Sequence, residues 1–274
     1  MPILLYFFAI RLQLSHRGVA RLLLMTDLSN ISRERQGNIL VLTLDRPAKK
    51  NAITSAMYQE LTAALSEATG DFEIRSVVLT GAGGTFTAGN DIFDFMNEPA
   101  KDESAPGFQF LAALHNFPKP LIAAVQGSAV GIGTTALLHC DLVYAALDTQ
   151  FQMPFVNLGL VPEAGSSLLF PRLVGHAKAS EIFLTGRSFG AQEALDMGLI
   201  NQITDSPLET AIKVATVIGD QPPTSVINTK ALLKSKDHLA IEQVMAVEGE
   251  LFRIALESEE AQIAFMKFLE KKGK

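Results

Sequence analysis

One acidic residue, Glu163, lies in a stretch of sequence that otherwise carries no charge. Between Asp148 and Arg172, every other residue is apolar, Gly, Pro or uncharged polar. Such neighbours make a carboxylate costly to desolvate, so its pKa should rise. A carboxyl group with a raised pKa suits general acid–base chemistry near neutral pH. The alternative is an ordinary solvated loop residue, and this stretch alone leaves both interpretations open.

Two glycine-rich segments could present backbone N–H groups to a negatively charged oxygen. The first, "GGTFTAGNDI" at 83–92, should point the N–H groups around Gly89 and Asn90 into a cleft. A tight turn with an Asp helix cap is the alternative for this segment. The second, "VQGSAVGIGTTALLHCD" at 125–141, could place the N-terminus of a helix against a developing negative charge.

The second segment also matches a dinucleotide-binding pattern. Residues 131–136 read G-x-G-x-x-A, and Asp148 follows at a little less than the usual distance, so a nicotinamide-dependent dehydrogenase is a rival interpretation. The predicted strand "LIAAV" ends before Gly127, however. The pattern requires its first glycine, here Gly131, directly at the end of a strand. The context therefore argues against a dinucleotide site.

The elements that must position these residues alternate between strands and helices, which predicts an α/β fold. Short apolar and β-branched runs predict strands, and apolar residues at helical spacing predict helices. The strands are expected within residues 38–47, 76–84, 119–127, 141–146 and 151–153. The helices are expected within residues 54–70, 133–140, 164–175, 176–186 and 191–199, and over most of 206–274.

The last predicted helix carries an apolar stripe. Ala261, Phe265, Phe268 and Leu269 fall on one helical face. Such a stripe either packs onto its own domain or forms an interface between subunits, and the sequence favours neither.

Composition narrows the classes of function. The chain has 274 residues, 48% of them hydrophobic and 19% charged, and a net charge of −6. This balance argues against disorder and against a broad nucleic-acid-binding surface. The single cysteine, Cys140, permits no internal disulfide, and the five histidines show no paired ligand spacing, so no metal site is predicted. These features are typical of a cytoplasmic globular enzyme.

Residues 1–29 are predicted to be an N-terminal extension. The apolar run "ILLYFFAI" at 3–10 is too short to cross a bilayer and lacks the basic start of a signal peptide. Met25 then precedes sequence typical of a domain start. We expect residues 1–24 to be either a mis-assigned translation start or a loosely held extension, with no membrane association.

The motifs in combination resemble the crotonase (enoyl-CoA hydratase/isomerase) superfamily. The matching pieces, from about residue 35 to 205, are "LDRPAKKNAIT", "FTAGNDI", "FPKPLIAAVQGSAVGIG", "CDLVYA", "FQMPFVNLGLVPEAGSS" and "LTGRSFGAQEALDMGLIN". The resemblance implies a crotonase-like core of repeated ββα turns at 30–205 and a C-terminal helical oligomerisation region at 206–274. It implies trimers or dimers of trimers, and an acyl-CoA thioester as substrate, with no separate cofactor.

The resemblance also assigns site residues. The oxyanion hole maps onto the backbone N–H groups of Asn90 and Ile132. The CoA-binding segment maps onto a loop and the "AGNDI" stretch, with the two lysines placed for the CoA phosphates. These positions are Lys49, Lys50, Ala52, Ala88, Gly89, Asn90, Asp91 and Ile92.

The absence of two glutamates distinguishes the possible activities within the superfamily. Enoyl-CoA hydratases use two glutamates to activate water, and the corresponding positions here are Thr135 and Phe155, which cannot do this work. Glu163 lies where peroxisomal-type 3,2-trans-enoyl-CoA isomerases, the closest subgroup, carry their base. The resemblance therefore implies an enoyl-CoA isomerase. The alternatives are hydratase or other crotonase-type chemistry, using Glu163 or Asp94, and a non-catalytic acyl-CoA-binding member.

Overall fold

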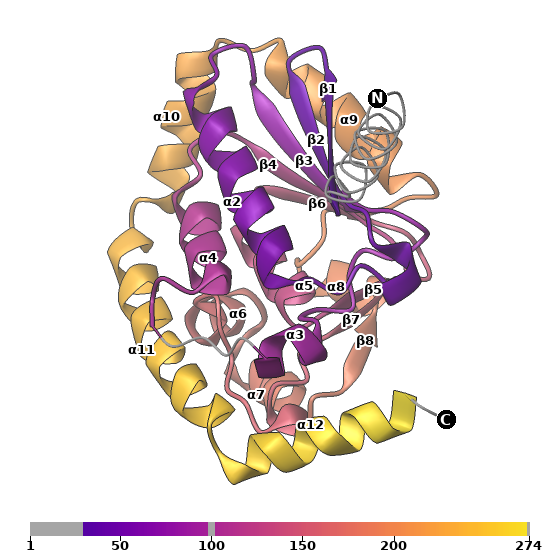
Figure 1. Cartoon of the computed structure of the whole chain (residues 1–274). Helices are drawn as coiled ribbons and strands as arrows, with labels where there is room; N and C mark the ends of the chain where they lie inside the picture. Colours follow the sequence, from indigo (N-terminus) through magenta and orange to yellow (C-terminus); the bar gives the residue numbers. More distant parts are fainter. Residues whose placement is uncertain (1–29, 98–101, 273–274) are drawn as a thin grey trace, which may run out of the picture. The chain divides into compact units, whose positions relative to one another are not determined.

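A six-stranded sheet forms the centre of the fold (Figure 1). The computed structural model describes residues 30–97 and 102–272, so the predicted extension at 1–29 lies outside the described residues. The strand order is β1-β2-β3-β4-β6-β9. Only β1 and β2 pair antiparallel, and the other neighbours are parallel. The strands are β1 (Ile31–Gln36), β2 (Ile39–Leu44), β3 (Ser76–Gly81), β4 (Leu121–Val125), β6 (Leu142–Ala145) and β9 (Gln202–Ile203).

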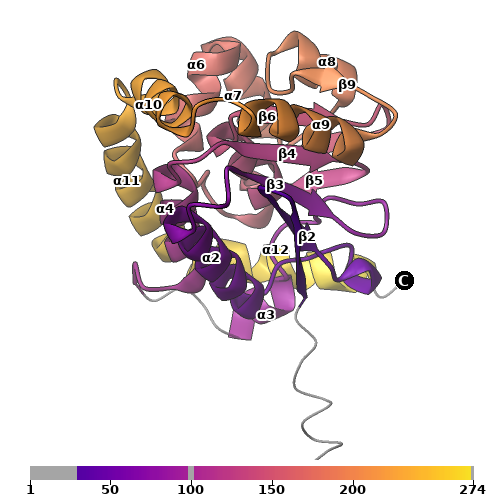
Figure 2. The same ribbon diagram turned by 90° about the horizontal axis from the view of Figure 1, so that it is seen from above.

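Both faces of this sheet are covered, which explains the continuous apolar runs of β3 and β4. On one face Ile122 and Ala124 pack with Ala211 and Ala215 of helix α9 (Pro207–Gly219). On the other face the alternate residues of the strands join the main core with α2 (Ser55–Gly70) and α4 (Pro106–Asn116). Figure 2 shows α9 and the α2–α4 pair on opposite sides of the strands.

A second sheet of three short strands carries part of the site. Strand β5 (Ser128–Val130) pairs parallel with β7 (Gln150–Gln152), and β7 pairs antiparallel with β8 (Ser188–Gly190). Five short helices connect the strands of the two sheets along the chain: η1 (Pro47–Lys49), α3 (Ile92–Asn97), α5 (Ile132–Thr135), η2 (Ala136–His139) and η3 (Val156–Leu158). The remaining helices of this region are α6 (Ser166–Val174), α7 (His176–Thr185) and α8 (Ala191–Asp196).

The C-terminal segment is helical, as predicted. Helices α10 (Pro223–Lys234), α11 (His238–Leu256) and α12 (Glu259–Lys272) follow one another along the outside of the fold (Figure 1). On α12, Ala261 and Phe265 are buried in the chain's own core, whereas Leu269 is partly exposed. The apolar stripe therefore packs at least in part onto its own domain.

Several elements were not predicted from the sequence, among them the helices α3 and α4 and the strands β1, β5, β8 and β9. The predicted strand "LIAAV" does end before Gly127, as β4, but a further strand that was not predicted, β5, runs from Ser128 to Val130, directly before Gly131. Strand β1 was not predicted because only Ile31 of its six residues is buried, which leaves no apolar pattern to detect. Within the described residues, no helix combines the length and the apolar character that a membrane span requires.

Candidate active site

A cavity of about 1060 Å³ gathers residues from six separate segments of the chain. The segments are the loop after β2, the stretch leading into α3, the turn from β5 into α5, the stretch from β7 through η3, and the helices α11 and α12. Every residue predicted for the amide pair and the CoA-binding segment lines it: Lys49, Lys50, Ala52, Ala88, Gly89, Asn90, Asp91, Ile92 and Ile132. Lys267 of α12 lines the same cavity. No local pattern in the sequence links this lysine to the loop after β2.

The N–H groups of Asn90 and Ile132 are both available to a ligand. Ile53 donates to the Gly89 carbonyl (2.8 Å) and accepts from Asp91 N–H (2.9 Å), so the intervening Asn90 N–H faces away from this ladder. Ile132 is the first residue of α5, where no intrahelical acceptor exists. Within residues 30–97 and 102–272, neither N–H donates a hydrogen bond. Two free donors in one cavity are suited to holding an oxyanion.

Close backbone packing brings the two N–H segments together. Thr87 N–H donates to the Ser128 carbonyl (2.9 Å), and Val130 N–H donates to the Thr87 carbonyl (3.1 Å). Gly89 has a φ of +84°, and a Cβ there would lie 2.7 Å from the Val130 carbonyl oxygen. Only glycine fits that position without displacing the backbone that leads into Gly131.

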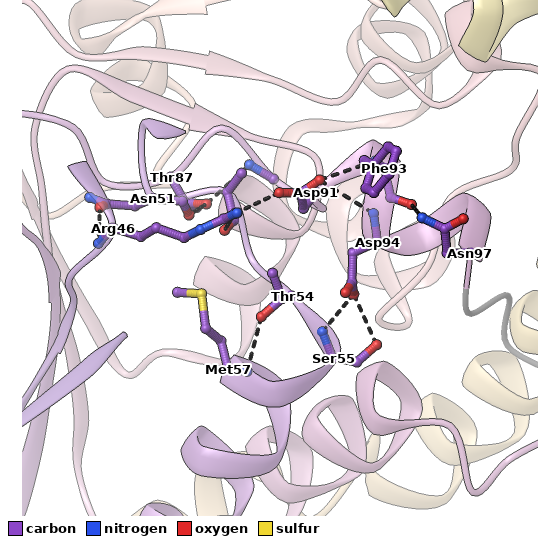
Figure 3. A network of polar contacts seen from close by, with 12 residues as sticks. Arg46, Asn51, Thr54, Ser55, Met57, Thr87, Asp91, Phe93, Asp94 and Asn97 are labelled. Atoms are coloured by element: carbon purple, nitrogen blue, oxygen red, sulfur yellow. Dashed lines mark hydrogen bonds and ion pairs between the residues drawn. The ribbon is translucent and has the colours of Figure 1, made fainter. Parts of the chain in front are cut away.

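A polar network fixes the segment that carries Asn90 (Figure 3). Arg46 forms an ion pair with Asp91 at 2.6 Å and also donates to the Ala52 carbonyl. Burial is the largest single influence on Asp91 and pushes its pKa upward, but the hydrogen bond and charge of Arg46, together with the N–H groups of Phe93 and Asp94, leave that pKa below its ordinary value. Asp94 accepts hydrogen bonds from the backbone N–H and the hydroxyl of Ser55 at 2.8 and 3.0 Å. Asp94, the alternative base, is thus engaged at the start of α2.

Glu163 is buried, which decides between the two interpretations that its neighbours in the sequence left open. It is 7% exposed. Burial raises the pKa of Glu163 to about 8, a hydrogen bond from Thr135 opposes the rise, and the carboxylate of Glu248 adds to it. The Thr135 hydroxyl donates to Oε1 of Glu163 at 2.5 Å. A carboxyl group poised near neutrality can both accept a proton and return it.

The loop around Glu163 is fixed by side chains from distant segments. Ala164 adopts a φ of +64°, an uncommon conformation for a residue other than glycine. Its carbonyl lies 2.7 Å from Nε2 of His139. The buried Glu248 of α11 accepts from the N–H groups of Gly165 (2.6 Å) and Ser167 (2.8 Å), so it caps the start of α6. The sequence analysis missed Glu248, because no local pattern connects it with this loop.

Glu163 is not among the described residues that line the large cavity. It borders a second cavity of about 400 Å³, together with residues of α4 and α11. Two buried side chains connect it to the amide segments. Thr135 follows Ile132 by one helical turn on α5. The Tyr58 hydroxyl donates to Asn90 Oδ1 (2.5 Å), and the pKa of Tyr58 is raised by burial and by the charge of Glu163.

The two positions of the hydratase glutamates are occupied without a carboxylate. Thr135 is fully buried and bonded to Glu163. Phe155 is buried and lines the large cavity. The site thus combines two unpaired amide donors with one buried acid.

Comparison with known proteins decides the family. Residues 34–274 match the family model described as Enoyl-CoA hydratase/isomerase. The chain belongs to this family. Members of the family act on acyl-CoA thioesters. The fold described above is therefore crotonase-like, and the chain is an enzyme of the enoyl-CoA hydratase/isomerase family.

Relatives within the enoyl-CoA hydratase/isomerase family include proteins named as isomerases and proteins named as hydratases. The chain is 37% identical over 247 residues to Enoyl-CoA delta isomerase 2 of Rattus norvegicus, covering 87% of this chain and 63% of the rat protein. It is 34% identical to 2,3-dehydroadipyl-CoA hydratase of Escherichia coli K12, covering 89% and 97% of the two chains. The solved structure of Pseudomonas aeruginosa OdaA is similar with a TM-score of 0.85 and 45% identity, covering 87% and 98%.

Proposed function

We propose that the protein is an enoyl-CoA isomerase that moves the double bond of a 3-enoyl-CoA to the 2-trans position. The observation that carries this proposal is which positions of the site have a carboxyl group and which lack one. Glu163 is buried with a pKa of about 8, while Thr135 and Phe155 stand where a hydratase would need carboxylates. The similarity to the rat isomerase supports it.

The proposed reaction needs one base and no water. The carboxylate of Glu163 removes a proton from C2 of the 3-enoyl thioester, and the electron pair of that C–H bond moves toward the thioester carbonyl. The resulting dienolate oxygen is held by the Asn90 and Ile132 N–H groups. The protonated Glu163 then delivers the same proton to C4, which leaves the double bond between C2 and C3. No atom is gained or lost.

The CoA portion is proposed to lie in the large cavity. Lys49 and Lys50 are exposed at its rim, and Lys267 of α12 adds a third positive charge. Ammonium groups that remain hydrated attract phosphates without fixing their geometry. The acyl portion would reach past the amides toward the smaller cavity that Glu163 borders.

A substrate comparison tests the proposal. Purified protein is offered 3-enoyl-CoA and 2-enoyl-CoA thioesters of matched chain length, and the products are separated by mass and by chromatography. We expect the 3-enoyl compound to be converted into the 2-trans isomer of unchanged mass. A hydratase, the second candidate that relatives such as the Escherichia coli protein support, would instead add water to the 2-enoyl compound. Preferred hydration would overturn the proposal, and binding of both thioesters without turnover would favour a non-catalytic member.

We also propose that the protein is a homotrimer or a dimer of trimers. Helices α10 and α11 expose large apolar side chains, which in a monomer would face water: Leu232, Leu233, Leu239, Val247, Leu251 and Ile254. Sedimentation analysis of the purified protein tests this, and a monomeric mass would contradict it.

A further inference from the structure

A second cluster of titratable side chains lies beside the smaller cavity, and the proposed isomerase reaction does not use it. His115 ends helix α4, while His238 and Glu242 lie one turn apart at the start of α11. One nitrogen or oxygen atom from each of the three side chains lies within 4.8 Å of the other two. His115 and Glu242 both line the cavity that Glu163 borders.

Of the three side chains, His115 gives the strongest indication that a ligand binds here. It is 4% exposed, and within the described part of the chain its Nε2 atom has no hydrogen-bond partner. A buried polar atom without a partner is rare in folded proteins, because the lost hydration is not replaced. A neutral imidazole ring offers a lone pair on one nitrogen, so Nε2 of His115 can serve as a metal ligand.

The other two members can complete a coordination set. Nε2 of His238 lies 3.4 Å from Oε1 of Glu242, close to the roughly 3.3 Å that separates two ligands of a tetrahedral zinc ion. The His238 ring stacks on His115 with 4.4 Å between centroids. Both His238 and Glu242 are partly exposed, so their side chains can turn toward His115 without disturbing the core.

Charges around the cluster are compatible with a cation. Glu103, Glu163 and Glu250 line the same cavity. Arg253 also lines it and pairs with Glu250. The Lys234 ammonium, which contributes to the lowered pKa of His115, is held by the His139 carbonyl at 3.0 Å.

We propose that His115, His238 and Glu242 bind a divalent transition-metal ion, with Zn²⁺ as the ion that best fits two imidazoles and one carboxylate. A fourth position would open to the cavity and hold water. The bound ion would join α4 to α11 beside Glu163. The spacing of the histidines predicted no metal site, because His115 is far from the other two in the chain. The His238–Glu242 pair, one helical turn apart, was a signal that the analysis of histidine pairs did not consider.

Metal titration of the full-length, untagged protein tests this proposal. After EDTA treatment and removal of the chelator, ZnCl₂ is titrated by calorimetry, and CoCl₂ is added separately to record its visible absorption. We expect a single ion to bind per chain. With CoCl₂ we expect the intense visible absorption bands of a cobalt ion with a low coordination number. His238→Ala and Glu242→Ala should each weaken binding at least about tenfold, since even loss of an outer-shell partner costs this much.

His176→Ala is the matched control, because His176 is an exposed histidine on another helix, α7. It should bind Zn²⁺ as the wild type does. The proposal fails if the wild type takes up no stoichiometric ion, or if His176→Ala weakens binding as much as the other two variants. Isomerase activity measured in EDTA is a separate readout, so a failed metal site would leave the proposed function untouched.

Discussion

The segments that carry the Asn90 and Ile132 N–H groups are joined by backbone hydrogen bonds, with the Arg46–Asp91 ion pair as an added support, whereas Glu163 is positioned by buried side chains from distant segments. Thr87 and Gly89 bring the two amide segments into contact through the main chain alone. Thr135, His139 and Glu248 fix the acid and its loop. Apart from the Arg46–Asp91 pair, the amide segments should therefore tolerate side-chain changes that keep the backbone, whereas the surroundings of Glu163 should not.

The largest effect is expected from Glu163→Gln. This substitution keeps the shape of the side chain but removes the only group proposed to carry the proton, so turnover of a 3-enoyl-CoA should fall by at least about 10²-fold. Binding of a non-reactive acyl-CoA, measured by calorimetry, should be unchanged. Glu257→Gln, at an exposed position, is the control and should keep full turnover. Normal turnover in Glu163→Gln would show that Glu163 is not the group that transfers the proton.

The next largest effect is expected when one of the two N–H donors is removed. Ile132 is the first residue of α5, a position where proline is tolerated, so Ile132→Pro removes the N–H donor. The loss of one oxyanion donor typically costs about 10²–10³-fold in kcat. Ile132→Ala keeps the donor and should retain most of the activity. Equal losses in both variants, with circular dichroism showing both folded, would mean that the side chain matters and the amide does not.

Thr135→Val is expected to shift the pH profile more than the maximal rate. The base must be deprotonated to accept the C2 proton, so kcat/KM of the wild type should rise with pH through the pKa of about 8. The Thr135 hydrogen bond holds that pKa down, and its removal should move the rise to higher pH. The measurement is kcat/KM across the pH range. An unchanged midpoint would show that Thr135 does not tune the acid.

The smallest effect is expected at the rim of the large cavity. Lys49→Ala and Lys267→Ala should each raise KM a few-fold and leave kcat nearly unchanged, because exposed charge pairs contribute only about 0–1 kcal/mol. Lys213→Ala, exposed on α9, is the control. A fall in kcat without a change in KM would place these lysines in the reaction rather than in CoA binding.

The same contrast explains what the sequence could predict. The apolar runs of β2, β3 and β4 and the helical spacing of α2 were sufficient to predict those elements, and the glycine segments revealed the amides. Strand β5 was missed because its three residues lie between two glycines. Glu248, Tyr58 and the His115 cluster could not be predicted, because each acts on a segment far away in the chain. Local patterns and the family resemblance thus led to the predicted amide pair and to Glu163, whereas the distant residues that support Glu163 became apparent only in the folded structure.

The most direct test uses an isotope label to follow the proton that moves from C2 to C4. A 3-enoyl-CoA carrying deuterium at C2 is isomerised, and the position of the label in the 2-trans product is read by NMR. A single buried acid that serves both carbons predicts that deuterium appears at C4 with the wild type, and that Glu163→Gln forms this product far more slowly. Hydrogen at C4 derived wholly from solvent, together with an undiminished rate in Glu163→Gln, would contradict the account.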